Sequence, residues 1–301
     1  MADFLSIRDL SKKDIERLLS LSSSMEKRIG KKGAGPLSGK IVSTMFFEPS
    51  TRTNMSFQAA AKRLGAHVLS FHPEKSSNVK GETFEDTVRM MDGYADALVI
   101  RHPQEGFAHK AAQIASHPVI NAGDGGNQHP SQTLIDLYTI KKLKGTLTGL
   151  KVALMGDLRH ARAMRSLLWG LSLYGNEISL VSPPSLRMEE SIVQEAMGHG
   201  AKISISSAPD LRGLDVLYVC RVQAERFDDP SSAQGLLQSF RLDAKLLSSA
   251  PDSMAILHPL PKIDEVDPAV DGDPRAKYFE QAKNGVPVRM AVLLHCINGK
   301  Q

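Results

Sequence analysis

The chain has 301 residues, of which 42% are hydrophobic and 23% charged, and its formal net charge is +4. This length exceeds one comfortable hydrophobic core and predicts two domains, and the composition excludes a disordered chain. The charges are dispersed, with no long basic run and no aromatic–basic interleaving, so nucleic-acid binding is not indicated. A small anionic substrate explains the excess of cations better.

The first half of the chain alternates short apolar runs with helical patterns. Ser11 and Asp14 resemble a capping box, and apolar residues recur at helical spacing from there to Ile29. Four predicted strands follow, which are KIVSTMFF, HVLSF, DALVI and PVINA. Between and after them, helices are predicted at about 53–64, 82–91, 107–115 and 131–144. Such βα alternation predicts a parallel sheet.

After a glycine-bounded linker at 145–149 the same alternation starts again. The predicted strands are KVALMGD, EISLVSP, KISIS, DVLYVCRV and MAILHPLP, with helices over 161–173 and near 189–197. A last helix, about 286–297, has a length that suits packing back on the first domain. We therefore expect an α/β protein with two doubly wound parallel-sheet domains.

The two cysteines and the N-terminus carry little functional signal. Cys220 and Cys296 each lie in an apolar stretch, without metal-ligand spacing or a disulfide framework, so both are predicted to be buried and structural. The N-terminus has no basic region followed by an apolar run, and no apolar segment approaches the roughly 18 residues of a membrane span. A soluble, cytoplasmic protein is expected.

The most specific stretch is FFEPSTRTNMSF, where a predicted strand ends and a helix begins. The hydroxyls of Ser50, Thr51 and Thr53 and the guanidinium of Arg52 lie at this junction. Free N–H groups and the positive end of the helix dipole attract a phosphate there, and these side chains would complete a multidentate cradle. A capping residue beside a solvated arginine is the alternative, because such caps are common.

Six further stretches appear in order behind this one, which are SSNVKGET, VIRHPQEG, NAGDGGNQHPSQTLIDL, GDLRHAR, CRVQAERF and LHPLPKIDE. Together they cover nearly the whole chain. The sequence resembles the aspartate and ornithine carbamoyltransferases, and FFEPSTRT is similar to their carbamoyl phosphate signature. The resemblance implies transfer of the carbamoyl group to an amine with release of phosphate, and with aspartate as acceptor this is a step of pyrimidine biosynthesis.

The resemblance also implies how the chain is divided. Residues 1–132, with 284–301 returning to them, would bind carbamoyl phosphate, residues 133–283 would bind aspartate, and the active site would lie between the two domains. The implied carbamoyl phosphate-binding residues are Ser50, Thr51, Arg52, Thr53, Ser76, Arg101, His129, Gln132, Pro259 and Leu260.

Within that set the implied roles differ. Thr53, Arg101 and His129 would hydrogen-bond the carbamoyl oxygen, where an attacking amine generates an oxyanion that such donors stabilise. Gln132 and the Pro259–Leu260 backbone would contact the carbamoyl nitrogen. Phosphate is a good leaving group and can itself accept the amine proton, so no protein nucleophile, cofactor or metal is expected.

Aspartate brings two carboxylates, and each is best held by a bidentate guanidinium. The resemblance assigns them to Arg162 and Arg221, for which a surface salt bridge is the alternative. Further implied aspartate-binding residues are Lys80, Gln223 and Leu260. Glu225 would orient Arg221, and Glu48 would pair with Arg162 and Arg226 when the domains close.

SSNVKGET has neither strand nor helix periodicity and by itself predicts a loop. In the family this loop reaches the neighbouring subunit's active site, so Ser76 and Lys80 are expected to complete an adjacent site in a homotrimer. Whether a separate regulatory chain binds the trimer is left open.

The sequence departs from the family pattern in a few places. Asn54 and Gln58 stand where an ion pair is usual, at i,i+4 spacing that lets two amides hydrogen-bond each other. Lys262 replaces the common arginine after HPLP, and His160-Ala161 replaces Tyr-Gly beside Arg162.

Three rival functions fit the motifs less well. An ornithine enzyme would show HCLP and an SMG stretch, whereas this chain has HPLP and no SMG. A dinucleotide-binding oxidoreductase is suggested by VALMGD, but Gly156 is followed by Asp157-Leu158 and no GxGxxG exists. A catalytically inactive binding paralogue would need a lost ligand, and all the expected ligands are present.

Overall fold

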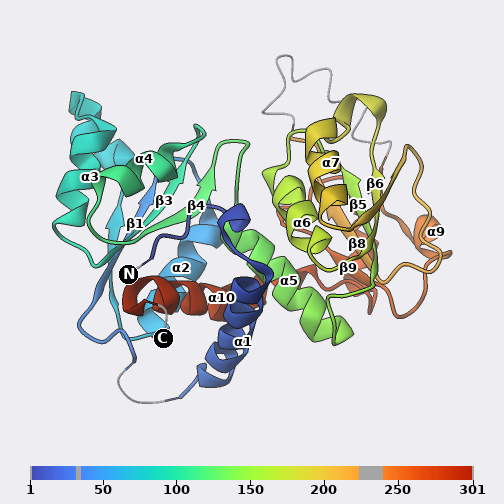
Figure 1. The fold of residues 1–301 in the computed structure, drawn as a ribbon, viewed down its shortest axis with the longest axis horizontal. Coiled ribbons are helices and arrows are strands. Elements are labelled where there is room, and N and C mark those ends of the chain that lie inside the picture. Colours follow the sequence, from blue (N-terminus) through green and yellow to red (C-terminus); the bar gives the residue numbers. More distant parts are fainter. Residues whose placement is uncertain (1, 32–34, 224–239, 300–301) are drawn as a thin grey trace. The chain divides into compact units, whose positions relative to one another are not determined.

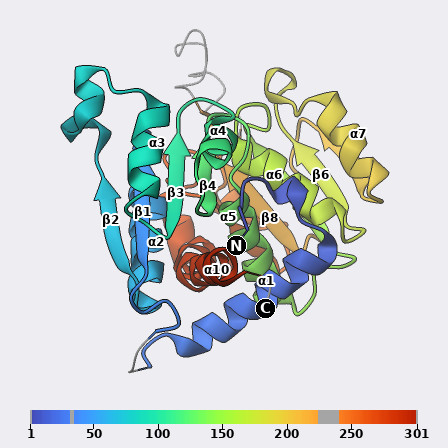
Figure 2. The ribbon, with the colours of Figure 1, turned by 60° about the vertical axis from the view of Figure 1, so that its left-hand side comes forward.

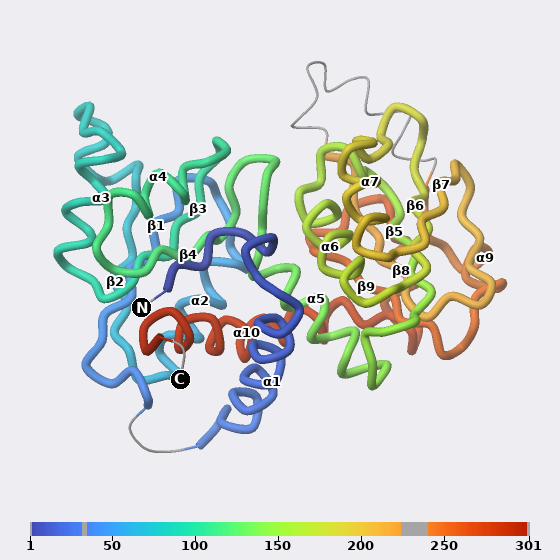
Figure 3. The backbone as a smooth tube through the Cα atoms, viewed as in Figure 1, coloured from blue at the N-terminus to red at the C-terminus, as the bar shows by residue number. Residues whose placement is uncertain are grey.

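The computed structural model describes residues 2–31, 35–223 and 240–299, and the chain forms two compact units (Figure 1). Unit 1 comprises Met1–Ile135 with Asn284–Gln301, and unit 2 comprises Asp136–Lys283. The chain passes from unit 1 to unit 2 within the helix α5 (Pro130–Lys144) and returns within α10 (Tyr278–Asn298), as the trace in Figure 3 shows. No helix in the described part of the chain is both long and apolar enough to cross a membrane.

Unit 1 is built on a four-stranded parallel sheet in the order β2-β1-β3-β4 (Figure 2). Its strands are β1 (Ile41–Phe46), β2 (His67–Phe71), β3 (Ala97–His102) and β4 (Val119–Asp124). Its other helices are α1 (Lys12–Arg28), α2 (Thr51–Arg63), α3 (Phe84–Asp92) and α4 (Phe107–Ile114), with the 3-10 turns Ile7–Asp9, Pro73–Lys75 and Ser77–Lys80.

Helices cover both faces of this sheet. On one face α3 and α4 contact each other and β3, and their apolar residues join those of the strands in one core that includes Met45, Val88 and Ala111 (Figure 1). On the other face α10 packs on α2, where the Arg289 guanidinium lies 4.9 Å from the Phe57 ring centroid. The predicted return of the C-terminal helix to the first domain is confirmed.

The start of the chain follows the local rules of helix formation. Ser11 and Asp14 form the predicted capping box of α1, in which each side chain accepts a hydrogen bond from the other residue's backbone. Farther along, the Gln58 side chain donates to the Asn54 side chain at 2.9 Å, which confirms the predicted amide pair on α2.

Unit 2 has a five-stranded parallel sheet in the order β7-β6-β5-β8-β9. Its strands are β5 (Lys151–Gly156), β6 (Glu177–Val181), β7 (Lys202–Ser206), β8 (Val216–Cys220) and β9 (Ala255–Leu257). Its other helices are α6 (Arg162–Ser172), α7 (Glu190–Gly198) and α9 (Ala244–Leu247), with 3-10 turns at Pro184–Leu186 and Pro268–Gly272. The predicted class, two doubly wound parallel sheets, is confirmed.

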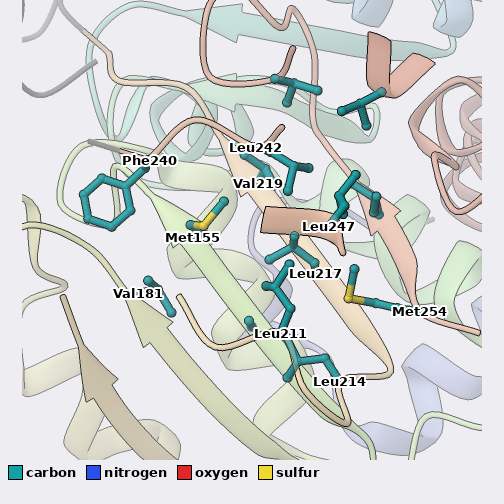
Figure 4. Packing of buried hydrophobic residues seen from close by; sticks show 14 of the residues in the cluster. Met155, Val181, Leu211, Leu214, Leu217, Val219, Phe240, Leu242, Leu247 and Met254 are labelled. Carbon is teal, nitrogen blue, oxygen red and sulfur yellow. The ribbon is translucent and has the colours of Figure 1, made fainter. Parts of the chain in front are cut away.

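Alternation along β8 separates the two faces of this sheet. Leu217 and Val219 point into a core that also contains Met155, Phe240 and Leu242 (Figure 4). Tyr218, the residue between them, points to the opposite face, because successive side chains of a strand alternate. Its hydroxyl donates to Asp136 at 2.9 Å.

Both cysteines are buried and free, as predicted. Burial raises the pKa of the Cys220 and Cys296 thiols, so neither is a thiolate at neutral pH. A structural role as small buried side chains fits both.

Candidate active site

Several ligands predicted from the sequence lie at the ends of four particular strands. In each unit the strand order reverses between two neighbours, β1 and β3 in unit 1 and β5 and β8 in unit 2. Ligands of doubly wound sheets bind outside the carboxyl ends of the strands at such a switch point. STRT lies beyond the end of β1, Arg101 is the next-to-last residue of β3, DLRHAR follows β5, and RVQ follows β8. These ligands thus lie at the two places where the topology itself predicts binding.

The start of α2 is exposed as a potential anion cradle. Ser50 occupies the N-cap position with extended backbone, but its side chain makes no capping hydrogen bond. Thr51 and Arg52 are exposed in the first turn, whereas Thr53 is buried. The capping alternative is therefore weakened, because the hydroxyl that would satisfy the first-turn N–H groups does not do so.

Arg101, the next-to-last residue of β3, pairs with Glu48 just beyond β1. One Nη atom of Arg101 lies 2.7 Å from a carboxylate oxygen of Glu48, and the other donates to the Ala122 carbonyl at 3.4 Å. The expected partners of Glu48 were Arg162 and Arg226. In this structure Glu48 pairs within its own unit, while Glu225 and Arg226 lie outside the described residues.

His102 follows Arg101 and is enclosed by aromatic rings. Its imidazole stacks on the Phe107 ring at 3.6 Å between centroids, and Nδ1 accepts the Gln104 N–H at 3.0 Å. Phe47 and Phe84 lie at the edges of the same cluster. Burial lowers the pKa of His102, so the ring is neutral at neutral pH.

A buried carboxylate holds the loop between β4 and α5. Asp124 accepts hydrogen bonds from the Gly106 and Gln128 backbone N–H groups at 3.0 and 3.1 Å and from the Asn127 side chain at 3.1 Å. The Asn121 side chain adds a fourth at 3.0 Å. This loop ends at His129, which is buried directly before the first turn of α5.

Gln132 lies in that first turn, and its backbone N–H donates to the His129 carbonyl at 2.9 Å. Two of the predicted ligands of the carbamoyl group, His129 and Gln132, are thereby kept on one helical turn. Their position depends on Asp124, a residue that was not among those predicted from the sequence. An aspartate at the end of a predicted strand, followed by two glycines, was the available signal.

The SSNVKGET segment is more ordered than its sequence predicts. It contains the 3-10 turn Ser77–Lys80, directly after the turn Pro73–Lys75, instead of an irregular loop, because Ser76 and Asn78 hydrogen-bond nearby backbone and each other. Asn78 also donates to Thr87 of α3 at 3.2 Å. Lys80 is exposed at the end of the second turn, so its ammonium group is presented to solvent.

In unit 2 a second buried aspartate organises the switch point. One oxygen of Asp157 accepts the His160 N–H at 2.9 Å, and the other accepts the Gln223 N–H at 3.0 Å. The residues after β5 and after β8 are thus tied to one carboxylate. The His160 imidazole lies 3.2 Å from both oxygens, which gives this departure from the family pattern a structural partner.

The two predicted aspartate-binding arginines lie in the two segments that this carboxylate joins, Arg162 after β5 and Arg221 after β8. Arg162 is the first residue of α6 and is 8% exposed. Arg221 directly follows β8 and donates to the Val222 carbonyl at 3.2 Å. The alternative of a surface salt bridge does not fit Arg162, because a guanidinium that is this buried needs anionic or polar partners.

The predicted Pro259–Leu260 contact lies just beyond β9. Leu260 has a φ of 52°, and the Leu260–Pro261 peptide bond is cis. Pro259 and Leu260 are half-buried. Nearby, Lys262 pairs with Asp271 at 3.1 Å, so this departure keeps a cation that is bound within unit 2.

Comparisons with known proteins identify the family of the chain. Two sequence models match the chain, described as the aspartate/ornithine carbamoyltransferase carbamoyl-P binding domain over residues 2–142 and the Asp/Orn binding domain over 148–296. The aspartate carbamoyltransferase catalytic subunit of Thermococcus onnurineus is 48% identical over 297 residues, which are 97% of this chain and 95% of that protein. That of Methanopyrus kandleri is 47% identical over 295 residues, covering 97% and 96%.

Solved structures give the same result. The catalytic subunit of M. jannaschii aspartate transcarbamoylase has a TM-score of 0.91 and 42% identity, covering 99% of this chain and 98% of that one. Aspartate transcarbamoylase from Trypanosoma cruzi, solved with carbamoyl phosphate and aspartate, has a TM-score of 0.93 and 38% identity, covering 97% and 95%. The chain therefore belongs to the aspartate/ornithine carbamoyltransferase family.

Proposed function

We propose that this protein is an aspartate carbamoyltransferase, which transfers the carbamoyl group of carbamoyl phosphate to the amine of L-aspartate and releases phosphate. The observation that supports this best is the position of several predicted ligands at both topological switch points, after β1 and at the end of β3 in one unit and after β5 and β8 in the other. Each unit thus supplies a separate set of polar groups, one suited to phosphate and one to carboxylates.

In unit 1 the ligands suit carbamoyl phosphate. Ser50, Thr51, Arg52 and Thr53 would bind the phosphate through hydroxyl, guanidinium and helix N-terminal N–H groups. Arg101 and His129, with Thr53, would donate to the carbamoyl oxygen and stabilise the oxyanion that forms when the amine attacks. The phosphate then leaves with the bonding electrons and can take the proton of the amine.

In unit 2 the ligands suit the second substrate. Arg162 and Arg221 would each bind one carboxylate of aspartate, and Gln223 would add a contact. The main chain of Pro259 and Leu260 would accept from the carbamoyl nitrogen, together with Gln132 of unit 1. The ligands of the two substrates thus divide between the two units, so residues of both would take part in the reaction.

Aspartate is favoured over ornithine as the acceptor. Two buried or half-buried arginines after β5 and β8 match a dicarboxylate, whereas ornithine carries an extra ammonium that such arginines would repel. The relatives from Thermococcus, Methanopyrus and Trypanosoma are aspartate enzymes. Ornithine is therefore the second acceptor to test.

The proposal extends to the oligomeric state and the location of the protein. Ser76 and Lys80 would complete the site of a neighbouring chain in a homotrimer, which is supported by the exposure of Lys80 on an ordered segment. Relatives are named as catalytic subunits, so a separate regulatory chain is a partner to test for. The mass of the native complex tests this. The cytoplasmic location stays a prediction from the sequence.

A direct assay tests the proposed activity. The purified protein is given carbamoyl phosphate with L-aspartate or L-ornithine, and the carbamoylated amino acid and phosphate are measured. We expect carbamoyl aspartate and phosphate in equal amounts, and loss of both with Arg52→Ala. Carbamoyl ornithine as the main product, or no product from a folded protein, would overturn the proposal. Lys62→Ala, at the far end of α2, is the matched control and should keep activity.

A further inference from the structure

His258 is a buried histidine with two defined ring partners. It directly follows β9 and is 1% exposed. The backbone N–H of Leu260 donates to its Nδ1 at 2.8 Å, and its Nε2 lies 2.8 Å from a carboxylate oxygen of Glu265. A backbone N–H can only donate, so Nδ1 is the acceptor and the ring proton is on Nε2. The neighbours therefore select one neutral tautomer.

Glu265 closes the same turn from the other side. It is 3% exposed, and besides His258 it accepts the Ile263 N–H, at 3.2 Å to each oxygen. Burial alone would raise the pKa of Glu265, but the hydrogen bonds and the His258 ring outweigh it and lower the pKa. An ionised carboxylate at this position favours the donated Nε2 proton and so reinforces the tautomer.

The backbone of His258 is held as well. Its N–H donates to the Gln281 side chain of α10 at 2.9 Å, and that amide donates to Asp136 of α5 at 2.7 Å. Asp136 in turn accepts from Tyr218. All these groups belong to unit 2 and are buried, so the main chain at His258 cannot shift without leaving several polar groups unsatisfied.

What this network fixes is an unusual main-chain conformation. Among the described residues, Leu260 is the only non-glycine residue with a positive φ, which is 52°. A side chain there crowds the neighbouring backbone, so this conformation is disfavoured relative to the usual regions. The hydrogen bond to His258 is the contact made by the Leu260 amide itself, so it opposes relaxation of that dihedral angle.

We propose that His258 and Glu265 are positioning residues of the transferase, which hold the Pro259–Leu260 main chain in the left-handed conformation that presents its carbonyl groups to the substrate. This inference rests on the proposed function, in which these carbonyls accept from the carbamoyl nitrogen. His258 does not touch the reacting atoms. It acts through Leu260, and Glu265 acts through the tautomer of His258.

Two substitutions of His258 separate the contacts. In His258→Asn the side-chain oxygen can reach the position of Nδ1 and keep the acceptor for Leu260, whereas His258→Gln reaches toward Glu265 and removes that acceptor. We expect His258→Gln to lower kcat about 10- to 100-fold and His258→Asn to lower it less than about 5-fold. Binding of inorganic phosphate, which depends on unit 1, should stay within about twofold in both.

A substitution of Leu260 distinguishes a positioning role of His258 from a general effect on stability. Leu260→Gly removes the side-chain cost of positive φ. Added to His258→Gln, it should recover at least about threefold of the lost kcat, measured against Leu260→Gly alone, because the conformation no longer needs the hydrogen bond as much. A merely structural role of His258 predicts additive or larger losses in the double variant, and that result would overturn the proposal.

The tautomer can be tested in the unaltered protein, whatever the variants' folding. Nitrogen-15 NMR of the histidine rings should show His258 with a proton on Nε2 and an accepting Nδ1, and Glu265→Gln should shift this signal. A proton on Nδ1 would refute the arrangement.

The two proposals fail differently. An inactive wild-type protein refutes the transferase, whereas an active wild-type protein with kcat unchanged in His258→Gln refutes only the positioning role.

Discussion

The carboxylate of Glu48 lies 2.7 Å from the guanidinium of Arg101, and the two residues come from the ends of β1 and β3, the strands on either side of the switch point in unit 1. A phosphate at this point would meet an arginine that already has an anionic partner. Glu48 therefore affects the phosphate cradle as well as any pairing with unit 2. Its substitution discriminates between these roles.

Glu48→Gln should leave carbamoyl phosphate affinity within about threefold of wild type while raising the KM for aspartate and lowering kcat. The amide can still accept from Arg101, and loss of the competing anion offsets the loss of orientation. Calorimetric titration with carbamoyl phosphate and steady-state kinetics check this. Abolished carbamoyl phosphate binding in a folded protein, or unchanged aspartate kinetics, would show that Glu48 has no closure role.

Asp124→Asn should reduce both stability and carbamoyl phosphate affinity. The amide cannot accept all four hydrogen bonds, so at least one buried N–H is left unsatisfied, at a cost of about 1 to 3 kcal/mol. Urea unfolding and carbamoyl phosphate titration measure the two effects.

The matched control is Asp92→Asn. Asp92 accepts the Ser116 and His117 N–H groups at 3.0 Å each, at the start of β4 and not at its end. It should lower stability but leave substrate affinity unchanged. Equal losses of affinity in both variants would mean that Asp124 supports the fold in general and not the loop before His129.

The stability of unit 1 should fall as the pH is lowered, in part through His102. Burial lowers the pKa of this ring in the folded state, against the attraction of Glu48 and Asp124 and with repulsion from Lys110. The unfolded chain then binds more protons as the pH falls from about 7 through its own pKa of about 6.5, so the free energy of unfolding decreases until the folded pKa is passed.

His102→Asn tests this, because its side-chain oxygen can keep the acceptor for Gln104 without titrating. Urea unfolding at several pH values should show a smaller loss of stability on acidification in this variant than in wild type. Nitrogen-15 NMR should give His102 a pKa below the ordinary histidine value of about 6.5. A pKa of His102 above about 6.5 would mean that the attraction of Glu48 and Asp124 outweighs burial.

The elements of the fold were predictable because their signals are periodic and local. Apolar runs such as KVALMGD are buried strands, and the capping box of Ser11 and Asp14 marks a helix start with groups that are neighbours in sequence. The proposed phosphate cradle is a local signal of the same kind, since its hydroxyls and arginine are contiguous in the sequence.

What sequence could not provide is the set of partners chosen by folding. Glu48 meets Arg101 because β1 pairs with β3, although the two residues are far apart in the chain. Asp157 joins two loops in the same way, and Ser76 closes turns through side-chain to backbone hydrogen bonds that have no period. Such contacts depend on loop geometry, which composition and periodicity do not encode.

Arg221→Gln should raise the KM for aspartate far more than that for carbamoyl phosphate. Loss of a charge-assisted bidentate contact costs about 2 to 4 kcal/mol when the partner charge is left buried, roughly 30-fold or more in affinity. Arg212→Gln is the control, because Arg212 is an exposed arginine of the same unit that pairs with Asp210. Equal effects on the KM values of both substrates would mean that Arg221 does not belong to the aspartate-binding pocket.

Sharing of active sites between chains gives a quantitative expectation. If each site combines Arg52 of one chain with Lys80 of a neighbour, every mixed trimer of Arg52→Ala and Lys80→Ala chains contains one site with neither lesion. Random assembly of equal amounts places about three quarters of the trimers in mixed states, so activity should recover to about a quarter of wild type, whereas each variant alone stays inactive. Lys75→Ala, at an exposed lysine of the same segment, is the matched control and should be active by itself. Native mass spectrometry establishes that mixed trimers have formed. If they have formed and no activity returns, Arg52 and Lys80 belong to a site within one chain, or Lys80 has no part in it.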